Sequence, residues 1–223
     1  MTALRAVLLD IDGTLVDSND AHAHAWAGAL GHFGHDIAFE KIRVLIGKGG
    51  DKLLVEVAGI EKESPQGKQI DQRRAQLFAR DHLPRLKAFP KARELLVRLR
   101  GDGLRLVVAT SAKGAEMDAL LEICEAKDLL HASTSSDDAE SSKPDPDIIK
   151  AALQKAGTSA SESVMLGDTP YDVEAARRGD VGTVAVRSGG WEDDALDGAL
   201  AIYDDVADLL ARYDNTPFAR RHG

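Results

Sequence analysis

Short runs of apolar residues alternate along this chain with segments that have the spacing of amphipathic helices. The first run covers residues 6–9, and three more cover 104–109, 164–166 and 183–186. Runs this short that are almost wholly apolar predict strands buried on both faces, as in parallel sheets. The segment 94–100, with its three leucines at helical spacing, is typical of the stretches between them. We therefore expect an α/β fold, a doubly wound parallel sheet covered by helices.

Residues 18–86 have a different character, because three helix-like segments follow one another there without a convincing strand. The first contains His22, Trp26 and Leu30 on one face, and the second, 39–57, is interrupted by the glycine-rich run 46–50. The sequence predicts an all-helical cap over 18–86, inserted into an α/β core formed by 1–17 and 87–223. An insertion between the first two strands would cover the strand ends and exclude water from a site there.

Composition limits the class of partner. Lys and Arg number 28 against 37 Asp and Glu, a net charge of −9 that argues against nucleic acid and favours a small substrate. The single cysteine, Cys124, lies in a helix-like segment and is expected to be a buried thiol in a reducing compartment. No signal peptide and no apolar run of about 18 residues is found, so a soluble cytoplasmic protein without membrane contact is expected. The oligomeric state is left open.

Two carboxylates follow the first apolar run directly. Asp10 and Asp12 are two residues apart, so in an extended segment both side chains point the same way and their charges crowd one volume. Such crowding is relieved by protonating one carboxyl group or by binding a divalent cation with oxygen ligands, such as Mg²⁺. Either arrangement suits catalysis by a nucleophilic carboxylate. The pentad 10–14 is also compatible with a simple Asx turn leaving a strand.

The other apolar runs end in polar residues as well. Thr110 and Ser111 follow the second run, and Asp168 and Asp172 follow the third, while Lys143 precedes a helix-like segment. Because the carboxyl ends of parallel strands share one edge of the sheet, these side chains are expected to converge. Together they would supply carboxylates for a metal, hydroxyl and amide groups for phosphate oxygens, and a lysine to offset charge. These are the groups that a phosphoryl-transfer site requires.

Each of these residues also has a purely structural interpretation. Residues 169–172 read as a capping box with proline at the first helical position, and Asp145 reads as the N-cap of a helix that starts at Pro146 and ends before Gly157. Thr110 or Ser111 could cap a helix, and Lys143 could be a solvated loop lysine. The joint order of carboxylate pair, hydroxyl, lysine and carboxylate, each at a predicted strand end, favours the functional interpretation.

These motifs together resemble the haloacid dehalogenase superfamily, in its helical-cap branch of phosphatases and phosphomutases. The residues that carry the resemblance lie in segments 10–18, 110–111, 143–146 and 167–172. The resemblance implies a phosphatase of small phosphorylated metabolites, of the sugar phosphate or phosphoglycolate type, that works through an aspartyl phosphate. A sugar phosphomutase of the β-phosphoglucomutase type is the alternative. A receiver-like phospho-switch is remote, because a receiver lacks both the second aspartate and the inserted cap.

The same resemblance implies roles for individual residues. Asp10 would be the nucleophile and Asp12 the acid and base. Mg²⁺ would be held by Asp10, by the backbone carbonyl of Asp12 and by Asp168. Phosphate oxygens would be held by Thr110, Ser111 and Lys143, with Asp172 orienting Lys143 or metal-bound water.

Residues of the predicted cap are also assigned by resemblance. His22 falls where relatives have a histidine that couples cap closure to proton transfer, although helical periodicity alone favours a packing role. Gly47 and Lys48 lie in a glycine-rich stretch that resembles the cap loop that reads substrate, and that could equally be a helix break. No arginine is found at the place where the mutase cap binds a second phosphate, although Lys48 could substitute for it. A phosphatase that binds a single phosphate group is therefore favoured.

Overall fold

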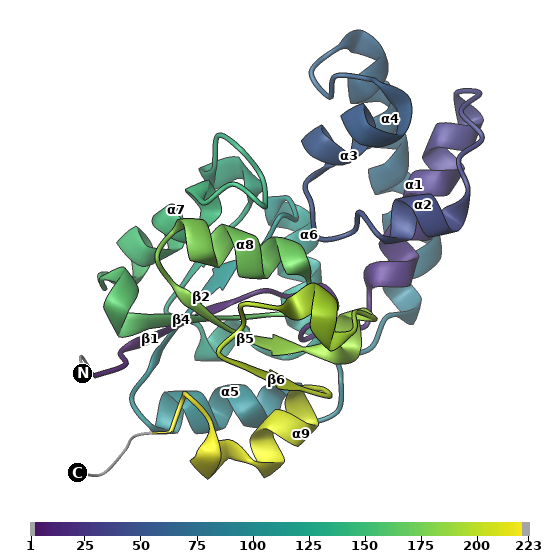
Figure 1. Ribbon diagram of the computed structural model, residues 1–223. Coiled ribbons are helices and arrows are strands. Elements are labelled where there is room, and N and C mark those ends of the chain that lie inside the picture. The colour runs from purple at the N-terminus through teal and green to yellow at the C-terminus, as the bar shows by residue number, and fades with distance from the viewer. Residues whose placement is uncertain (1–2, 220–223) are drawn as a thin grey trace. The chain divides into compact units, whose positions relative to one another are not determined.

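The computed structural model describes residues 3–219 and divides into two compact units (Figure 1). One unit comprises residues 1–17 and 87–223, and the other comprises residues 18–86. Residues 1–2 and 220–223, the outer limits of the core predicted from the sequence, lie outside the described residues.

A parallel sheet forms the centre of the first unit. Within residues 3–219 it has six strands in the order β3-β2-β1-β4-β5-β6. The strand bounds are β1 Ala6–Leu9, β2 Arg105–Ala109, β3 Ala132–Thr134, β4 Ser163–Gly167, β5 Gly182–Val186 and β6 Ala201–Tyr203. The strand order reverses between β1 and β4, which is where ligands bind in open α/β sheets. The predicted α/β fold with a parallel sheet is confirmed.

Helices cover both faces of this sheet, with α7 and α8 on one face and α5 and α9 on the other (Figure 1). Their bounds are α5 Ala92–Gly101, α6 Gly114–Ile123, α7 Asp147–Ala156, α8 Pro170–Arg178 and α9 Val206–Ala211. Leu8, Val107 and Met165 pack in one apolar cluster with Ile149 and Ala175. Burying these apolar side chains is the main force that holds the strand ends in place.

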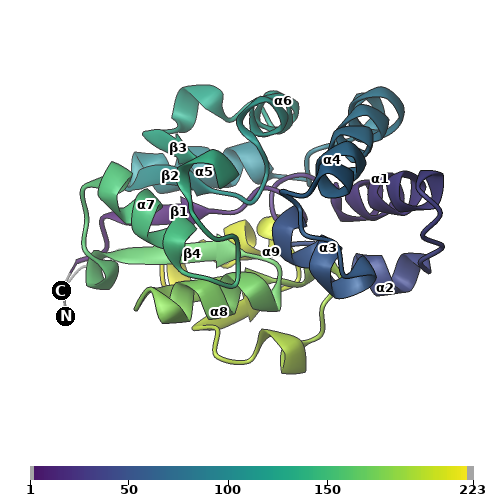
Figure 2. The same cartoon turned by 90° about the horizontal axis from the view of Figure 1, so that it is seen from above.

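The second unit is helical and has a core of its own. Its helices are α1 Asn19–His32, α2 Phe39–Arg43, α3 Gly50–Ala58 and α4 Pro65–Leu77, followed by a π-helical turn Phe78–His82 and a 3₁₀ turn Leu83–Arg85. Helix α1 packs against α2 and α4 (Figure 2). The apolar cluster of this second unit includes Trp26, Leu30, Ile42, Leu54 and Ile70. We refer to residues 18–86 below as the helical unit.

Two predicted helix starts had different outcomes. Helix α7 begins at Asp147 with Pro146 as its N-cap, so the prediction that Asp145 caps this helix is wrong. The Asp145 carboxylate instead accepts a hydrogen bond from Arg178 Nη1 at 3.0 Å, a partner on α8. The end of α7 at Gly157 is as predicted, with a left-handed φ of 62° that favours glycine. The predicted capping box at the start of α8 is present, with Thr169 and Asp172 as its members.

The Cys124 thiol is buried, as predicted, and burial raises its pKa to about 11. A thiol with such a pKa is almost entirely protonated at neutral pH and is a poor nucleophile.

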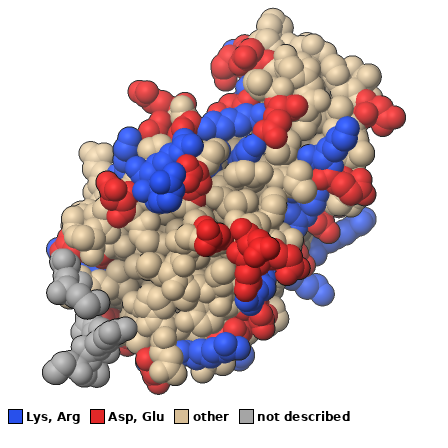
Figure 3. Space-filling view, viewed as in Figure 1, with Lys and Arg blue, Asp and Glu red and all other residues tan. Residues whose placement is uncertain are grey.

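None of the helices in residues 3–219 combines the length and apolar character that crossing a membrane requires. On the face shown in Figure 3, acidic and basic side chains are interspersed.

Truncating a side chain in the central strand should destabilise the core. Leu8 is fully buried in β1, so we expect Leu8→Ala to lower the free energy of unfolding by about 2–5 kcal/mol. Val97, on α5, is 48% exposed, and Val97→Ala should change it by less than about 0.5 kcal/mol. Urea unfolding followed by circular dichroism measures both values. Equal effects of the two substitutions would contradict this view of the core.

Candidate active site

Two carboxylates meet where β1 and β4 end. Asp10 follows the last residue of β1, and Asp168 follows the last residue of β4. The Asp10 backbone N–H donates to the Leu166 carbonyl at 2.9 Å, so the pairing of the two strands continues to the start of the loops. Both side chains are buried. The sheet therefore places two acidic groups side by side at the point where its strand order reverses.

A single ammonium group lies among these carboxylates. Lys143 Nζ is 2.6 Å from Asp10 Oδ1 and 2.7 Å from Asp172 Oδ1. The Lys143 side chain is only 1% exposed, so the solvated loop lysine considered from the sequence is not what the structure contains. Burying charges in this way is costly unless they are paired, and this lysine is paired twice. Asp10, Lys143 and Asp172 form what we call the buried charge cluster, with Asp168 beside it.

Asp172 has two functions in this arrangement. Its Oδ2 accepts hydrogen bonds from the Thr169 backbone N–H at 3.0 Å and from the Thr169 hydroxyl at 2.7 Å, which caps α8. Its other oxygen, Oδ1, faces Lys143. A Cβ on Gly167 would lie 2.6 Å from Asp172 Cβ, so the strand can approach this carboxylate only with glycine at that position. Helix capping therefore fixes Asp172 in the orientation that pairs it with Lys143.

Burial and the neighbouring charges together shift the pKa values of Asp10 and Lys143. Burial is the largest cause that raises the pKa of Asp10 well above its ordinary value, and the nearby carboxylates act in the same direction while Lys143 opposes them. Burial would lower the pKa of Lys143, but attraction to Asp10 and Asp172 outweighs burial and raises it. Lys143 is thus an ammonium ion at neutral pH, and one positive charge does not balance three carboxylates.

Asp10, Asp168 and Asp172 each offer a carboxylate oxygen, and these oxygens lie within 4.8 Å of one another. A set of donors made up only of oxygen fits a hard divalent cation such as Mg²⁺. The side chain of Asp12, which is half-buried, is not a member of this group of described residues.

Thr14 is a site residue for which the sequence indicated no individual role. Its hydroxyl donates to Asp168 Oδ1 at 2.8 Å, and both groups are buried. Thr14 is the last residue of the Asp10–Thr14 pentad, and its place in that motif is the sequence signal that could have indicated a role in the site.

The predicted phosphate-binding hydroxyls lie at the end of the neighbouring strand. Thr110 follows β2, is fully buried, and accepts a hydrogen bond from the Ala112 backbone N–H at 3.1 Å. Ser111 is half-buried. Because β2 pairs with β1, these residues lie on the same edge of the sheet as Asp10. Phosphate binding by Thr110, Ser111 and Lys143 remains a prediction.

The residues predicted to read substrate from the cap make contacts inside the helical unit. The His22 ring is buried on α1 and stacks on Phe78, with ring centroids 4.1 Å apart and an interplanar angle of 9°. Lys48 forms an ion pair with Glu56. Gly47 has a φ of 106°, a conformation that favours glycine. Their roles toward substrate remain predictions.

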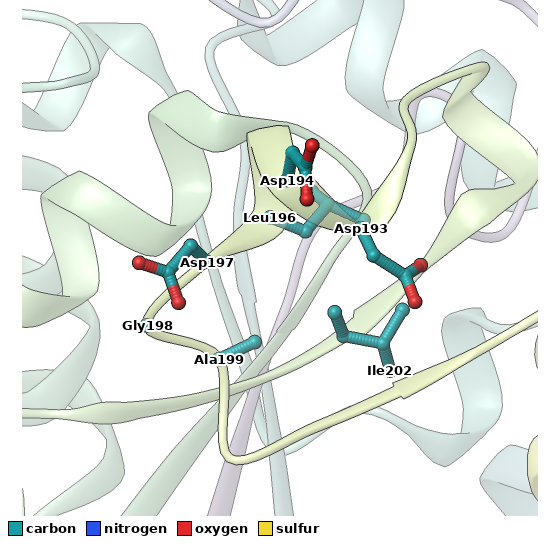
Figure 4. Close-up of a pocket in the computed structure, with 7 residues that line it drawn as sticks. All are labelled: Asp193, Asp194, Leu196, Asp197, Gly198, Ala199 and Ile202. Atoms are coloured by element: carbon teal, nitrogen blue, oxygen red, sulfur yellow. The ribbon is translucent and has the colours of Figure 1, made fainter.

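A hollow of about 450 Å³ lies elsewhere in the first unit and is lined by the segment 193–202 (Figure 4). It contains none of the residues predicted to be functional. The side chains of Asp193, Asp194 and Asp197 border it, and Leu196 and Ile202 contribute apolar surface. The buried charge cluster, and not this hollow, is the candidate active site.

Removing the ammonium group from the buried charge cluster should destabilise the protein. We expect Lys143→Met to cost about 3–5 kcal/mol at neutral pH, because Asp10 and Asp172 would lose their buried counter-ion. Folding raises the pKa of the Asp10 carboxyl group, so its ionisation removes stability as the pH rises from the ordinary pKa towards the raised one. The deficit of Lys143→Met should therefore shrink as the pH is lowered through that range. Urea unfolding at several pH values measures the deficit.

Lys155 provides the control for this prediction. It pairs with Asp138 at 2.7 Å, but its side chain is 36% exposed. Lys155→Met should lower the free energy of unfolding by about 1 kcal/mol or less. A Lys143→Met variant that loses no more stability than this control would contradict the ionic structure assigned to the cluster.

Comparison with known proteins identifies the same family that the sequence motifs resemble. The family model of haloacid dehalogenase-like hydrolases matches residues 7–186. A phosphoglycolate phosphatase from Rhodospirillum rubrum is 32% identical over 217 residues, which are 92% of this chain and 89% of that protein. A hydrolase from Pseudomonas syringae has the same fold, with a TM-score of 0.89, 31% identity, and coverage of 97% of this chain and all of that one.

A β-phosphoglucomutase from Clostridium difficile is more distant. It superposes with a TM-score of 0.83 over 96% of this chain and 97% of its own, at 17% identity, which shows a shared fold only. The family predicted from the sequence is confirmed by the family model and by the relatives of higher identity. The chain is an enzyme of the haloacid dehalogenase-like hydrolase family.

Proposed function

We propose that this protein is a Mg²⁺-dependent phosphatase that hydrolyses small phosphomonoesters through a phosphoryl group carried on Asp10. The observation that carries the proposal is the buried charge cluster at the end of β1, with Asp168 beside it. A relative of 32% identity is named a phosphoglycolate phosphatase, which supports the same reaction class. Phosphoglycolate and sugar phosphates are the substrate types that we expect first.

The proposed reaction has two displacement steps. In the first, a carboxylate oxygen of Asp10 attacks phosphorus, the bond from phosphorus to the ester oxygen breaks, and Asp12 protonates the departing alcohol. In the second, Asp12 takes a proton from water as that water attacks phosphorus, which releases phosphate and restores the Asp10 carboxylate. General acid and base catalysis of this kind contributes roughly 10²–10⁴ in rate.

The remaining residues of the site would bind the cation and the phosphate oxygens. Asp10, the backbone carbonyl of Asp12, and Asp168 would hold Mg²⁺, and Asp172 would keep Lys143 in place. When bound, the cation offsets the charge of the carboxylates and of the transferring phosphoryl group. Thr110, Ser111 and Lys143 would hold phosphate oxygens, which is consistent with the protonated state of Lys143. Each of these roles belongs to the proposal.

The helical unit, residues 18–86, would act as the cap that closes over the substrate and excludes water. His22, Gly47 and Lys48 would then determine which phosphomonoester fits. A cytoplasmic location is part of the proposal, because a lone cysteine with a buried thiol suits a reducing compartment.

A sugar phosphomutase is the second candidate, since a β-phosphoglucomutase shares the fold. The experiment that separates the candidates is phosphate release from phosphoglycolate, sugar phosphates and nucleotides with Mg²⁺, run beside conversion of β-glucose 1-phosphate to the 6-phosphate. Phosphate release from one or a few compounds supports the phosphatase. Isomerisation without release would replace it by the mutase, and no reaction in either assay would contradict both.

The nucleophile can be tested by one substitution. We expect Asp10→Asn to reduce phosphate release to background, because an amide cannot form the aspartyl phosphate, while the circular dichroism spectrum stays that of the parent. Asp118→Asn is the control, since that carboxylate is 62% exposed on α6 and should leave turnover unchanged. Normal turnover by the Asp10→Asn variant would refute the assignment.

A further inference from the structure

The loop that follows β5 touches the candidate site at two places. It forms a 3₁₀ turn over Arg187–Gly189, and Gly190 follows with a φ of 86°. No motif in the sequence pointed to this loop. Its contacts nevertheless reach both the turn after β1 and the carboxylate after β4.

The first contact is between Gly189 and the Asp168 carboxylate. A Cβ built on Gly189 would lie 1.9 Å from Asp168 Oδ2 and 2.7 Å from Asp168 Cγ, distances that no side chain can occupy. The other oxygen, Oδ1, accepts the hydrogen bond from the Thr14 hydroxyl at 2.8 Å. The last torsion of an aspartate is broad, so a carboxylate held at one oxygen can still rotate. Thr14 on one side and the Gly189 backbone on the other leave Asp168 with one orientation.

The second contact is between Ser188 and the turn that carries Asp12. The Ser188 hydroxyl donates to the Gly13 carbonyl at 2.7 Å across 175 positions of sequence. Gly13 has a φ of 76°, and its N–H donates to the Val16 carbonyl at 2.8 Å. Both peptide groups that flank Gly13 are therefore hydrogen-bonded, one within the turn and the other to the β5 loop. These two hydrogen bonds fix the backbone that lies between Asp12 and Thr14.

The loop itself is tied to its surroundings. Arg187 makes two hydrogen bonds to Asp193, at 2.6 and 2.9 Å, and one to Asp204 at 2.7 Å. Exposed ion pairs of this kind contribute little stability each, but a guanidinium with three such bonds has a defined orientation. The Gly190 N–H donates to the Arg187 carbonyl at 2.8 Å and closes the turn. Ser188 and Gly189 thus lie on a segment held at both ends.

We propose that Ser188 and Gly189 are positioning residues for cation binding: Gly189 fixes the Asp168 carboxylate and Ser188 fixes the Gly13 turn in the geometry that the cation requires. The inference rests on the metal site of the proposed function. Gly189 acts through the Asp168 carboxylate, and Ser188 acts through the turn whose backbone includes the Asp12 carbonyl. Groups that orient metal ligands commonly change metal affinity by about 10–100-fold when they are lost.

The direct test is Mn²⁺ binding to the full-length protein, followed by electron paramagnetic resonance without substrate. We expect Gly189→Ala to weaken Mn²⁺ binding at least about tenfold, because the added methyl group displaces the Asp168 carboxylate. Gly101→Ala is the matched control, since a Cβ there meets no atom within 4 Å, and it should bind Mn²⁺ as the parent does.

Ser188 gives an independent test should the Gly189→Ala variant fail to fold. We expect Ser188→Ala to bind Mn²⁺ several-fold more weakly and to raise the Mg²⁺ concentration for half-maximal turnover, with kcat at saturating Mg²⁺ changed less. Ser188→Thr keeps the hydroxyl and should restore both values. Ser161→Ala, at an exposed serine, controls for loss of a hydroxyl elsewhere.

The outcomes distinguish the positioning role of Ser188 and Gly189 from the metal site on which it rests. Weaker binding in Ser188→Ala, restored by threonine, supports the positioning role, because a general loss of stability would lower the melting temperature without that pattern. Parent-like Mn²⁺ affinity in folded variants at both positions would overturn the inference and leave the proposed function intact. Absence of Mn²⁺ binding by the parent protein would overturn the metal site and the inference together.

Discussion

Three buried carboxylates around one ammonium ion are the constraint on which the rest of this structure depends. Asp10, Asp168 and Asp172 offer oxygens within 4.8 Å of one another, and Lys143 contacts two of these residues. One positive charge cannot offset three negative ones in a buried volume, so the site is suited to accept a further cation. The fold must hold like charges together against their repulsion, and the apolar strands beneath them provide the rigidity to do so.

Local structure and chemistry share the same atoms at this site. Asp172 caps α8 with one oxygen and faces Lys143 with the other, so the helix start and the ion pair stabilise one orientation. The glycines at 167 and 189 have a related function, because each lets the backbone approach a carboxylate where a side chain would collide. Substituting either glycine would therefore disturb the site without removing any functional group from it.

The sequence predicted most of this arrangement, and the exceptions have physical reasons. Strands β1, β2, β4 and β5 were predicted because they are almost wholly apolar and buried. Strands β3 and β6 are three-residue edge strands that are only partly buried, so their sequences carry no clear pattern. The Thr14 to Asp168 and Ser188 to Gly13 hydrogen bonds span 154 and 175 positions. Such pairings depend on the strand order, which a single sequence does not display.

The most direct test of the central claim is to identify the residue that carries the phosphoryl group. The enzyme would be mixed with the best substrate of the panel, quenched during turnover and treated with borohydride, which reduces an acyl phosphate to an alcohol. Peptide mass spectrometry then locates the reduced side chain. Reduction at position 10 is the predicted result. Reduction at another carboxylate, or at none while phosphate is released, would contradict the role assigned to Asp10.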